Sequence, residues 1–129
     1  MKYFTTPSGS LYCQGTVDHA DCAITTGEQA LNVPNAMSCD SIRNSRVTAI
    51  GYLAAKDTQA CWFTSQGYRD PNAPVVNYGE VAVLDSPVGN LNCTVAVNGV
   101  TCLTSGGESG FFASRSKFGI QTNGTMHIP

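Results

Sequence analysis

The chain has few charged residues and no cluster of basic ones. Only 12% of its 129 residues are Asp, Glu, Lys or Arg, about half the share in an average soluble domain. Seven basic and nine acidic side chains give a formal net charge of −2 at pH 7. Nucleic-acid-binding proteins carry a clustered basic face, and polybasic membrane anchors carry a run of Lys and Arg. We therefore expect neither a nucleic-acid partner nor a charged membrane anchor.

Long apolar runs and metal-ligand patterns are also missing from the sequence. No stretch of about 20 apolar residues is present, so no transmembrane segment is predicted. The chain has two histidines, no Cys-x-x-Cys pair and no DxDxDG run. Structural zinc sites need closely spaced ligand pairs, and calcium loops need that acidic run. We predict no metal site and no cofactor.

Cysteine is abundant by comparison, with six residues in the chain. An even number of cysteines in a small, weakly charged chain indicates disulfides and an oxidising compartment. Met1 is followed by Lys2 and Tyr3 without an apolar stretch, so we expect that a leader has been removed. The expected location is outside the cell or in the cell envelope.

An internal repeat relates the two ends of the chain. A shift of 80 residues aligns eight identical residues of segment 4–31 with segment 84–111, without a gap. The identical pairs are Pro7 and Pro87, Gly9 and Gly89, Leu11 and Leu91, Cys13 and Cys93, Val17 and Val97, Cys22 and Cys102, Gly27 and Gly107, and Glu28 and Glu108. A repeat is first a statement about fold. We predict two similar halves, related by a pseudo-two-fold rotation, within one domain spanning 1–129.

Each repeat contains a Cys-x8-Cys segment with the pattern of a β-hairpin. In CTVAVNGVTC, small and β-branched residues alternate around Asn98-Gly99. A two-residue turn at Asn98-Gly99 would leave Cys93 too far from Cys102 for a disulfide, whereas a four-residue loop over 96–99 places them opposite each other. In this register Gly99, or His19 in the first copy, takes a left-handed backbone conformation. Six cysteines allow fifteen connectivities, and the symmetry of the repeat selects Cys13–Cys22, Cys93–Cys102 and Cys39–Cys61.

The rest of the chain has the pattern of short strands separated by turns. Strands are expected within 46–54, 59–65, 73–79, 80–86 and 110–122. A short helix is expected near 36–44, and a proline-bearing loop over 67–76. Short strands with frequent turn residues are typical of β-sandwiches and β-barrels. The predicted fold class is an all-β, disulfide-stabilised sandwich or barrel.

Four motifs stand out: TPSGSLYC at 6–13, NYGE at 77–80, SPVGNLNC at 86–93 and ESGFFASRSKF at 108–118. Together with Cys22 and Cys102 they resemble an exported actinobacterial family with a SPSGNIxC start and a GxGFxxSR end. The chain departs from that pattern at Tyr12, where the family often has a small residue, and at 108–109, where it tends to have Gly-His. The resemblance implies secretion or an envelope lipoprotein, with disulfides, but no reaction and no catalytic residues.

Two patterns could carry catalysis. GESGF at 107–111 looks like the surroundings of the nucleophile in chymotrypsin-like proteases, which need a histidine base within reach. Gly107 and Glu108 are repeat positions, however, and His19 lies at a predicted turn tip, so a scaffold role is favoured. Glu28 and Glu108 form a symmetric pair that could act as acid and base in a small hydrolase. The alternative is that each carboxylate accepts backbone hydrogen bonds.

The remaining signals favour recognition over catalysis. Tyr, Trp and Arg are the residues that most often anchor interfaces, and loops on a rigid scaffold often carry them. The candidate binding residues are Trp62, Tyr68, Arg69, Tyr78 and Arg115. Each has a packing alternative: Trp62 could lie in the core beside a disulfide, and Arg115 could pair with Glu108 or Glu80.

These observations predict a secreted or envelope-attached, non-catalytic binding module whose partner is a protein or an envelope glycan. The first alternative is an inhibitor of an extracellular hydrolase, because a rigid loop on a disulfide-bonded scaffold loses little entropy on binding. The second alternative is the small carboxylate-dependent hydrolase.

Overall fold

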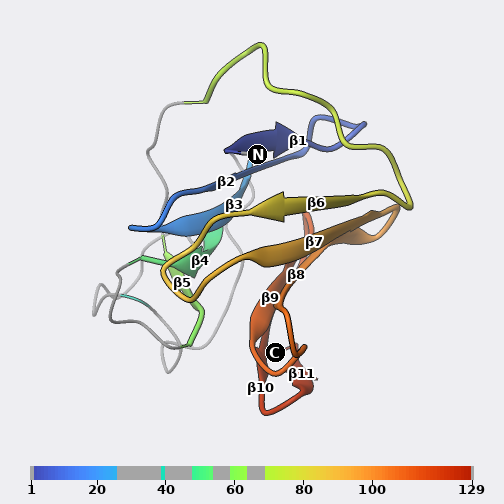
Figure 1. Ribbon diagram of the computed structural model, residues 1–129. Coiled ribbons are helices and arrows are strands. Elements are labelled where there is room, and N and C mark those ends of the chain that lie inside the picture. Colours follow the sequence, from blue (N-terminus) through green and yellow to red (C-terminus); the bar gives the residue numbers. More distant parts are fainter. Residues whose placement is uncertain (1, 26–38, 40–47, 54–58, 64–68, 129) are drawn as a thin grey trace.

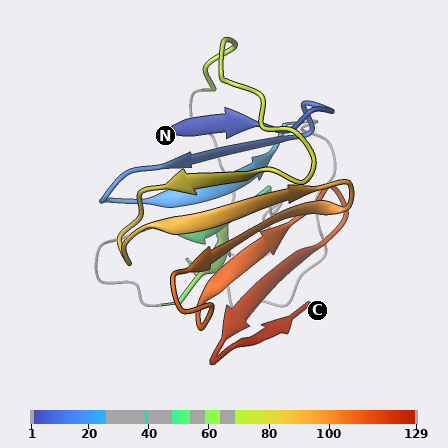
Figure 2. The same ribbon diagram turned by 45° about the vertical axis from the view of Figure 1, so that its right-hand side comes forward.

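The chain folds into two antiparallel β-sheets (Figures 1 and 2). The computed structural model describes residues 2–25, 39, 48–53, 59–63 and 69–128. The strands of the first sheet are β1 (Tyr3–Thr5), β2 (Leu11–Gly15), β3 (Ala20–Ile24), β4 (Ala49–Tyr52) and β5 (Cys61–Phe63). Those of the second sheet are β6 (Val81–Leu84), β7 (Leu91–Ala96), β8 (Gly99–Thr104), β9 (Gly110–Ala113), β10 (Phe118–Thr122) and β11 (Thr125–His127). Within each sheet every strand pairs with the next one along the chain, so both sheets are meanders.

One hydrophobic core lies between the inner faces of the two sheets. The largest fully buried side chains come from both sheets and include Trp62, Tyr52, Phe4, Phe111 and Phe118. Tyr52 and Phe111 meet edge to face across the interface, with ring centroids 6.2 Å apart. Among the described residues, each named strand pairs only with strands of its own sheet, so the two sheets do not close into a barrel. The architecture is therefore a sandwich, one of the two predicted forms.

The two sheets differ in how their outer faces are covered. In β7 burial alternates, with Leu91 buried and Asn92 exposed, as expected of a sheet with one face in water. In β3 and β4 every residue is buried. The strands β3 and β4 are therefore covered on both faces of the first sheet, whereas β1 and β5 are partly exposed on one face.

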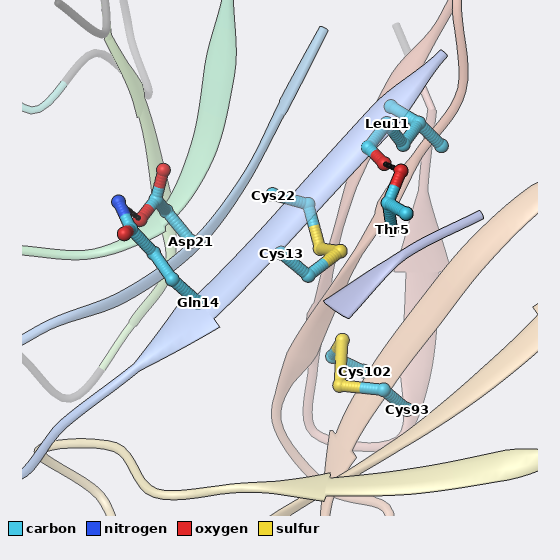
Figure 3. Close-up of a disulfide and its surroundings, with 8 residues drawn as sticks. All are labelled: Thr5, Leu11, Cys13, Gln14, Asp21, Cys22, Cys93 and Cys102. Atoms are coloured by element: carbon cyan, nitrogen blue, oxygen red, sulfur yellow. Dashed lines mark hydrogen bonds between the residues drawn. A yellow bond between two sulfur atoms is a disulfide. The ribbon is translucent and has the colours of Figure 1, made fainter. Parts of the chain in front are cut away.

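The three predicted disulfides, Cys13–Cys22, Cys93–Cys102 and Cys39–Cys61, are all present. Cys13 lies directly opposite Cys22, and Cys93 opposite Cys102, as the hairpin register requires. All four of these cysteines are fully buried in the shared core. Figure 3 shows the Cys13–Cys22 bond, with Gln14 and Asp21 on the other side of the same two strands.

The hairpin tips differ from the prediction in detail. In the first hairpin the four residues 16–19 form the loop, as predicted, but His19 does not have positive φ. There the Thr16 N–H donates to the His19 carbonyl oxygen (2.7 Å) and the Asp18 N–H donates to the Thr16 hydroxyl (3.1 Å), which closes the turn without a left-handed residue. In the second hairpin Ala96 still pairs with Gly99, which leaves a two-residue turn. Gly99 does have positive φ, at 145°.

The other expected elements are confirmed in most places. The segments 46–54, 59–65 and 80–86 contain β4, β5 and β6, and the segment 110–122 contains β9 and β10. The strand expected over 73–79 is wrong. Val75 makes only an isolated parallel bridge to Thr5, and Pro74 has no N–H to extend a ladder. The described part of the proline-bearing loop, 69–76, contains no strand, as predicted, whereas the helix expected near 36–44 lies outside the described residues, apart from Cys39.

The repeat occupies matching strands in the two sheets, although one register differs. The β2–β3 and β7–β8 ladders have the same register under the 80-residue shift. In the first sheet Phe4 lies opposite Cys13, but in the second Ala82, rather than Leu84, lies opposite Cys93. The pseudo-two-fold relation between the halves stays a prediction.

Candidate functional site

Trp62 is part of the core and is not a surface binding residue. Its side chain is 1% exposed, on the inner side of β5, so the packing alternative is correct. The prediction that it contacts a ligand is wrong for a simple reason. Alternation on the strand sends its neighbour Phe63 to the other face, and that face is itself partly covered, so no aromatic side chain has to be exposed. Tyr68 lies outside the described residues.

Arg69 and Asp70 attach the proline-bearing loop to the first sheet. The Arg69 guanidinium donates to the Ile24 carbonyl oxygen (3.1 Å). The Asp70 carboxylate accepts a hydrogen bond from the Tyr3 hydroxyl (2.8 Å), and the Asp70 N–H donates to the Tyr12 hydroxyl (3.3 Å). The Asp70 carboxylate also accepts a hydrogen bond from the Asn72 N–H (2.9 Å), and this bond, together with that from the Tyr3 hydroxyl, holds the pKa of the Asp70 carboxyl below its usual range. Arg69 therefore serves to position the loop, although the sequence suggested that it binds a ligand.

Tyr78 and Arg115 line one pocket of about 340 Å³ at the end of the sandwich where the β7–β8 hairpin turns. Four segments form its walls: the turn before β2, the loop before β6, the β7–β8 tip and the turn after β9. In Figures 1 and 2 the β7–β8 tip and the β2–β3 tip lie at opposite ends of the molecule. The pocket is rich in hydroxyl groups, contributed by Thr6, Ser8, Ser10, Ser114 and Ser116 as well as Tyr78.

The NYGE motif is a tight turn that exposes Tyr78. The Glu80 carboxylate accepts a hydrogen bond from the Asn77 N–H (2.8 Å), and the Glu80 N–H donates to the Asn77 carbonyl oxygen (3.0 Å). Gly79 has φ of 86°, a conformation that costs glycine little, and its N–H donates to the Val95 carbonyl oxygen (2.7 Å). The turn is thus fixed to β7, and it leaves Tyr78 46% exposed at the pocket wall.

The ASRSK segment is a second tight turn, and it carries Arg115. The Ser114 hydroxyl accepts hydrogen bonds from the N–H groups of Ser116 (3.3 Å) and Lys117 (2.9 Å). The Ser114 N–H donates to the Lys117 carbonyl oxygen (2.9 Å). Because Ser114 is buried and makes these bonds, Arg115 and Ser116 are held at the exposed position of the turn.

Gly99 brings the hairpin tip against the Arg115 turn. A Cβ atom at this position would overlap the carbonyl oxygen of Ala113 and lie 2.8 Å from the Phe112 ring. Only glycine fits so close a contact between β8 and β9. The exposed tip residues Val97 and Asn98 are thereby placed at the pocket wall.

Arg115 is the only charged residue among the described residues that line the pocket. The alternative that it pairs with Glu108 or Glu80 is wrong. Glu80 is bound to the Asn77 turn instead, and the one ion pair within the described ranges joins His19 to Asp21. The pocket therefore has a positive charge on a chain whose formal net charge is −2.

The proposed catalytic carboxylates do not form a described site. Glu28 lies outside the described residues, and Glu108 is exposed and does not line the pocket. No group of three or more His, Cys, Asp or Glu side chains suited to a metal occurs within the described ranges.

Asp21 is a buried carboxyl group that no motif in the sequence marks. Its side chain is 2% exposed on the outer face of β3 and accepts a hydrogen bond from Gln14 (3.1 Å), with His19 Nε2 at 4.0 Å. Desolvation by burial raises its pKa to about 6, and the Gln14 hydrogen bond and the positive charges of His19 and Arg69 partly oppose that rise. The sequence places Asp21 beside Cys22, on the opposite face of the strand, but it does not show that this face is covered.

Comparison with protein-family models, with the curated proteins and with the solved structures found no match. The resemblance to the exported actinobacterial family stays a prediction. Three disulfides are consistent with an oxidising, extracellular location. No helix in the described part of the chain is long and apolar enough to cross a membrane.

Proposed function

We propose that this protein is a secreted or envelope-attached, non-catalytic binding module whose ligand occupies the pocket between Tyr78 and Arg115. One observation carries the proposal: two residue types typical of recognition, on two separate rigid turns, converge on one concave polar site. Loops held by a rigid scaffold are the usual place for binding residues. The pseudo-two-fold repeat, in this view, supplies the scaffold, and the turns placed on it supply the function.

A glycan fits this site better than a protein surface does. Protein interfaces bury about 800 Å² on each partner around an apolar centre. The pocket is instead small and hydroxyl-rich, at the lower end of the range of about 300–1,000 Å³ for small-ligand sites. The exposed ring of Tyr78 offers an apolar face for the C–H groups of a sugar, and the hydroxyl and amide groups around it match sugar hydroxyls. Envelope glycans lie in the oxidising compartment that the disulfides indicate.

The test is direct binding of saccharides to the oxidised protein. Soluble oligosaccharides released from cell envelopes should perturb the amide resonances of Tyr78, Gly99 and Arg115 in NMR titrations. Tyr78→Ala should weaken binding at least tenfold without changing the melting temperature, because the ring is exposed and the turn is held by backbone and Glu80 contacts. Val75→Ala is the matched control, since Val75 is 55% exposed and does not line the pocket. An equal loss in both variants, or no binding by the wild type, would contradict the proposal.

A second function, inhibition of an extracellular hydrolase, is favoured by the proline-bearing loop. The Thr5 N–H donates to the Pro74 carbonyl oxygen (2.9 Å) and the Val76 N–H to the Thr5 carbonyl oxygen (3.0 Å), so the loop is fixed to β1 while Val75 projects outward. A rigid exposed segment of this kind pays little entropy on entering a cleft. Tight inhibition of a protease or lysozyme that Val75→Glu abolishes and Tyr78→Ala preserves would select this function over the first.

A further inference from the structure

We propose that the ligand of the Tyr78–Arg115 pocket is an anionic saccharide, with an acidic group that binds the Arg115 guanidinium. The inference rests on the proposed function and specifies its ligand class. It follows from three features of the pocket: an unpaired cation, uncommitted neutral donors and a fixed geometry.

The first feature is the charge of Arg115. Its guanidinium forms no ion pair or side-chain hydrogen bond with the described part of the chain, although acidic residues outnumber basic ones in the sequence. Glu80 follows Tyr78 closely in the chain, but its carboxylate is bound to the Asn77 N–H. A guanidinium presents five N–H donors in a planar fork that matches a carboxylate or a phosphate. An acidic ligand group would supply the counter-charge that the surrounding protein does not.

The second feature is a set of neutral polar groups beside the cation. The side chains of Asn98, Ser116 and Tyr78 line the pocket and make no hydrogen bond with other described residues. Ser8 and Ser10 are bonded to each other through their hydroxyl oxygens (2.7 Å), and the Ser8 hydroxyl also accepts from the Ser10 N–H (3.3 Å) and meets the Thr6 hydroxyl (3.4 Å). These bonds fix the turn and leave acceptor capacity on Ser10. An inorganic anion would need only the guanidinium, whereas this set of groups suits the hydroxyls of an attached sugar ring.

The third feature is the rigidity of the walls. The Arg115 turn is closed by four hydrogen bonds of Ser114, and the Tyr78 turn is fixed to β7 by Gly79. Gly99 holds the hairpin tip against the strand that leads to Arg115. The cation and the aromatic ring are therefore held at the pocket before a ligand arrives, which lowers the entropic cost of binding.

The experiment compares two disaccharides that differ only in the acidic group: cellobiose and cellobiouronic acid, with cellobiose 6′-phosphate as a third probe. Binding to the oxidised protein is followed by NMR at low salt. We expect at least tenfold stronger binding of an acidic probe than of cellobiose, with a preference that declines as salt is added. Arg115→Gln should remove the preference, so that the acidic probes bind no more tightly than cellobiose, and should preserve the melting temperature, because Ser114 and the backbone hold the turn.

Val17 and Val97 provide a matched pair of variants. They are equivalent in the repeat, and both are exposed at hairpin tips (69% and 83%), but only Val97 lines the pocket. Val97→Glu places a negative charge beside Arg115 and should weaken binding of the acidic probe several-fold. Val17→Glu, with the same change in net charge, should have no effect. Equal effects of the two variants would overturn the assignment to this pocket.

The outcomes separate the inference from the function on which it rests. Equal binding of cellobiose and the acidic probes would overturn the anionic inference and leave the glycan-binding function standing. No binding of any saccharide, with binding of an acidic peptide in its place, would overturn both. Binding of inorganic phosphate as strong as that of the acidic sugars would overturn the saccharide class. Stronger binding of either acidic sugar, lost in Arg115→Gln, supports the proposal, and the stronger of the two identifies the acidic group.

Discussion

At the scale of single residues, Asp21 is the side chain that couples the stability of this fold to pH. Its pKa is raised from 3.8 to about 6, so between these values the folded state holds a proton that the unfolded chain has lost. Stability from this group is therefore greatest below pH 4 and falls as the pH rises through 6. The loss by pH 7.5 is about 3 kcal/mol, from 1.36 kcal/mol per pKa unit.

Asp21→Asn should remove that dependence, because asparagine keeps an oxygen for the Gln14 hydrogen bond and carries no charge to desolvate. We expect the variant to be more stable than the wild type at pH 7.5 and nearly equal to it at pH 4, in urea unfolding at both values. Asp18→Asn is the control, since Asp18 is exposed on the same hairpin. Equal stabilisation by both substitutions, or a variant less stable than the wild type at pH 7.5, would contradict the role of burial.

Gly51 is the residue that permits β4 to lie close to β3. A Cβ atom there would overlap the Ala20 carbonyl oxygen and lie 2.6 Å from the Asp21 Cα atom. Gly51→Ala should therefore destabilise the protein by about 1–3 kcal/mol, the usual cost of overpacking. Gly106→Ala is the matched control, because the nearest atom to its Cβ would be Glu108 Cγ at 3.9 Å. Equal urea midpoints for the two variants would contradict the prediction, because they would show that β3 and β4 can move apart without loss of stability.

At the scale of elements, the Cys-x8-Cys hairpins are held together by both a disulfide and the strand ladder. Replacing Cys93 and Cys102 together with alanine should lower the free energy of unfolding by about 2–3 kcal/mol, since the bond closes a short loop in the unfolded chain. The hairpin should still form, because Thr94 pairs with Thr101 and Val95 with Val100. Urea unfolding measures the loss of free energy of unfolding. An NMR spectrum of the backbone amides at low temperature checks that β7 and β8 still pair. An unchanged midpoint would contradict the prediction.

These hairpins were predictable from the sequence because everything that determines them is local. Strand alternation and the reach of a disulfide leave one register for Cys93 and Cys102, and the repeat transfers it to Cys13 and Cys22. Features that depend on distant segments were not predictable in the same way. The sequence could not show that the outer face of β5 is partly covered, which lets Phe63 face that way while Trp62 enters the core. Nor could it show that Glu80 is bound within its own turn, which left Arg115 unpaired.

The candidate site was predictable only in its parts. Tyr78 and Arg115 were recognised by residue type, but their convergence depends on how β6 to β9 are ordered in the second sheet, and the pocket wall before β2 depends on how the two sheets stack. No local pattern encodes either arrangement. Asp21 was missed because a single aspartate in a strand usually faces water, and here the outer face of the first sheet is covered.

At the scale of the whole molecule, the shared core predicts that the two sheets unfold together. Trp62, the only tryptophan, lies on β5, so its fluorescence follows the unfolding of the first sheet. Ile120 is fully buried in the second sheet, and Ile120→Val should cost about 0.5–1.5 kcal/mol. If the sheets form one cooperative unit, this substitution shifts the Trp62 transition in urea as far as it shifts the transition seen by far-UV circular dichroism.

Ile50→Val supplies the matched control, because Ile50 is equally buried but lies opposite Trp62 in the first sheet. It should move both transitions whether or not the sheets are coupled. Only the Ile120 variant distinguishes the two cases, since independent sheets would leave the Trp62 midpoint unchanged and split the circular dichroism curve. The Tyr52–Phe111 contact and the hydrogen bond between the hydroxyls of Tyr52 and Ser109 cross the interface, and both favour coupling. Coincident shifts would also establish 1–129 as one domain, as the sequence predicts.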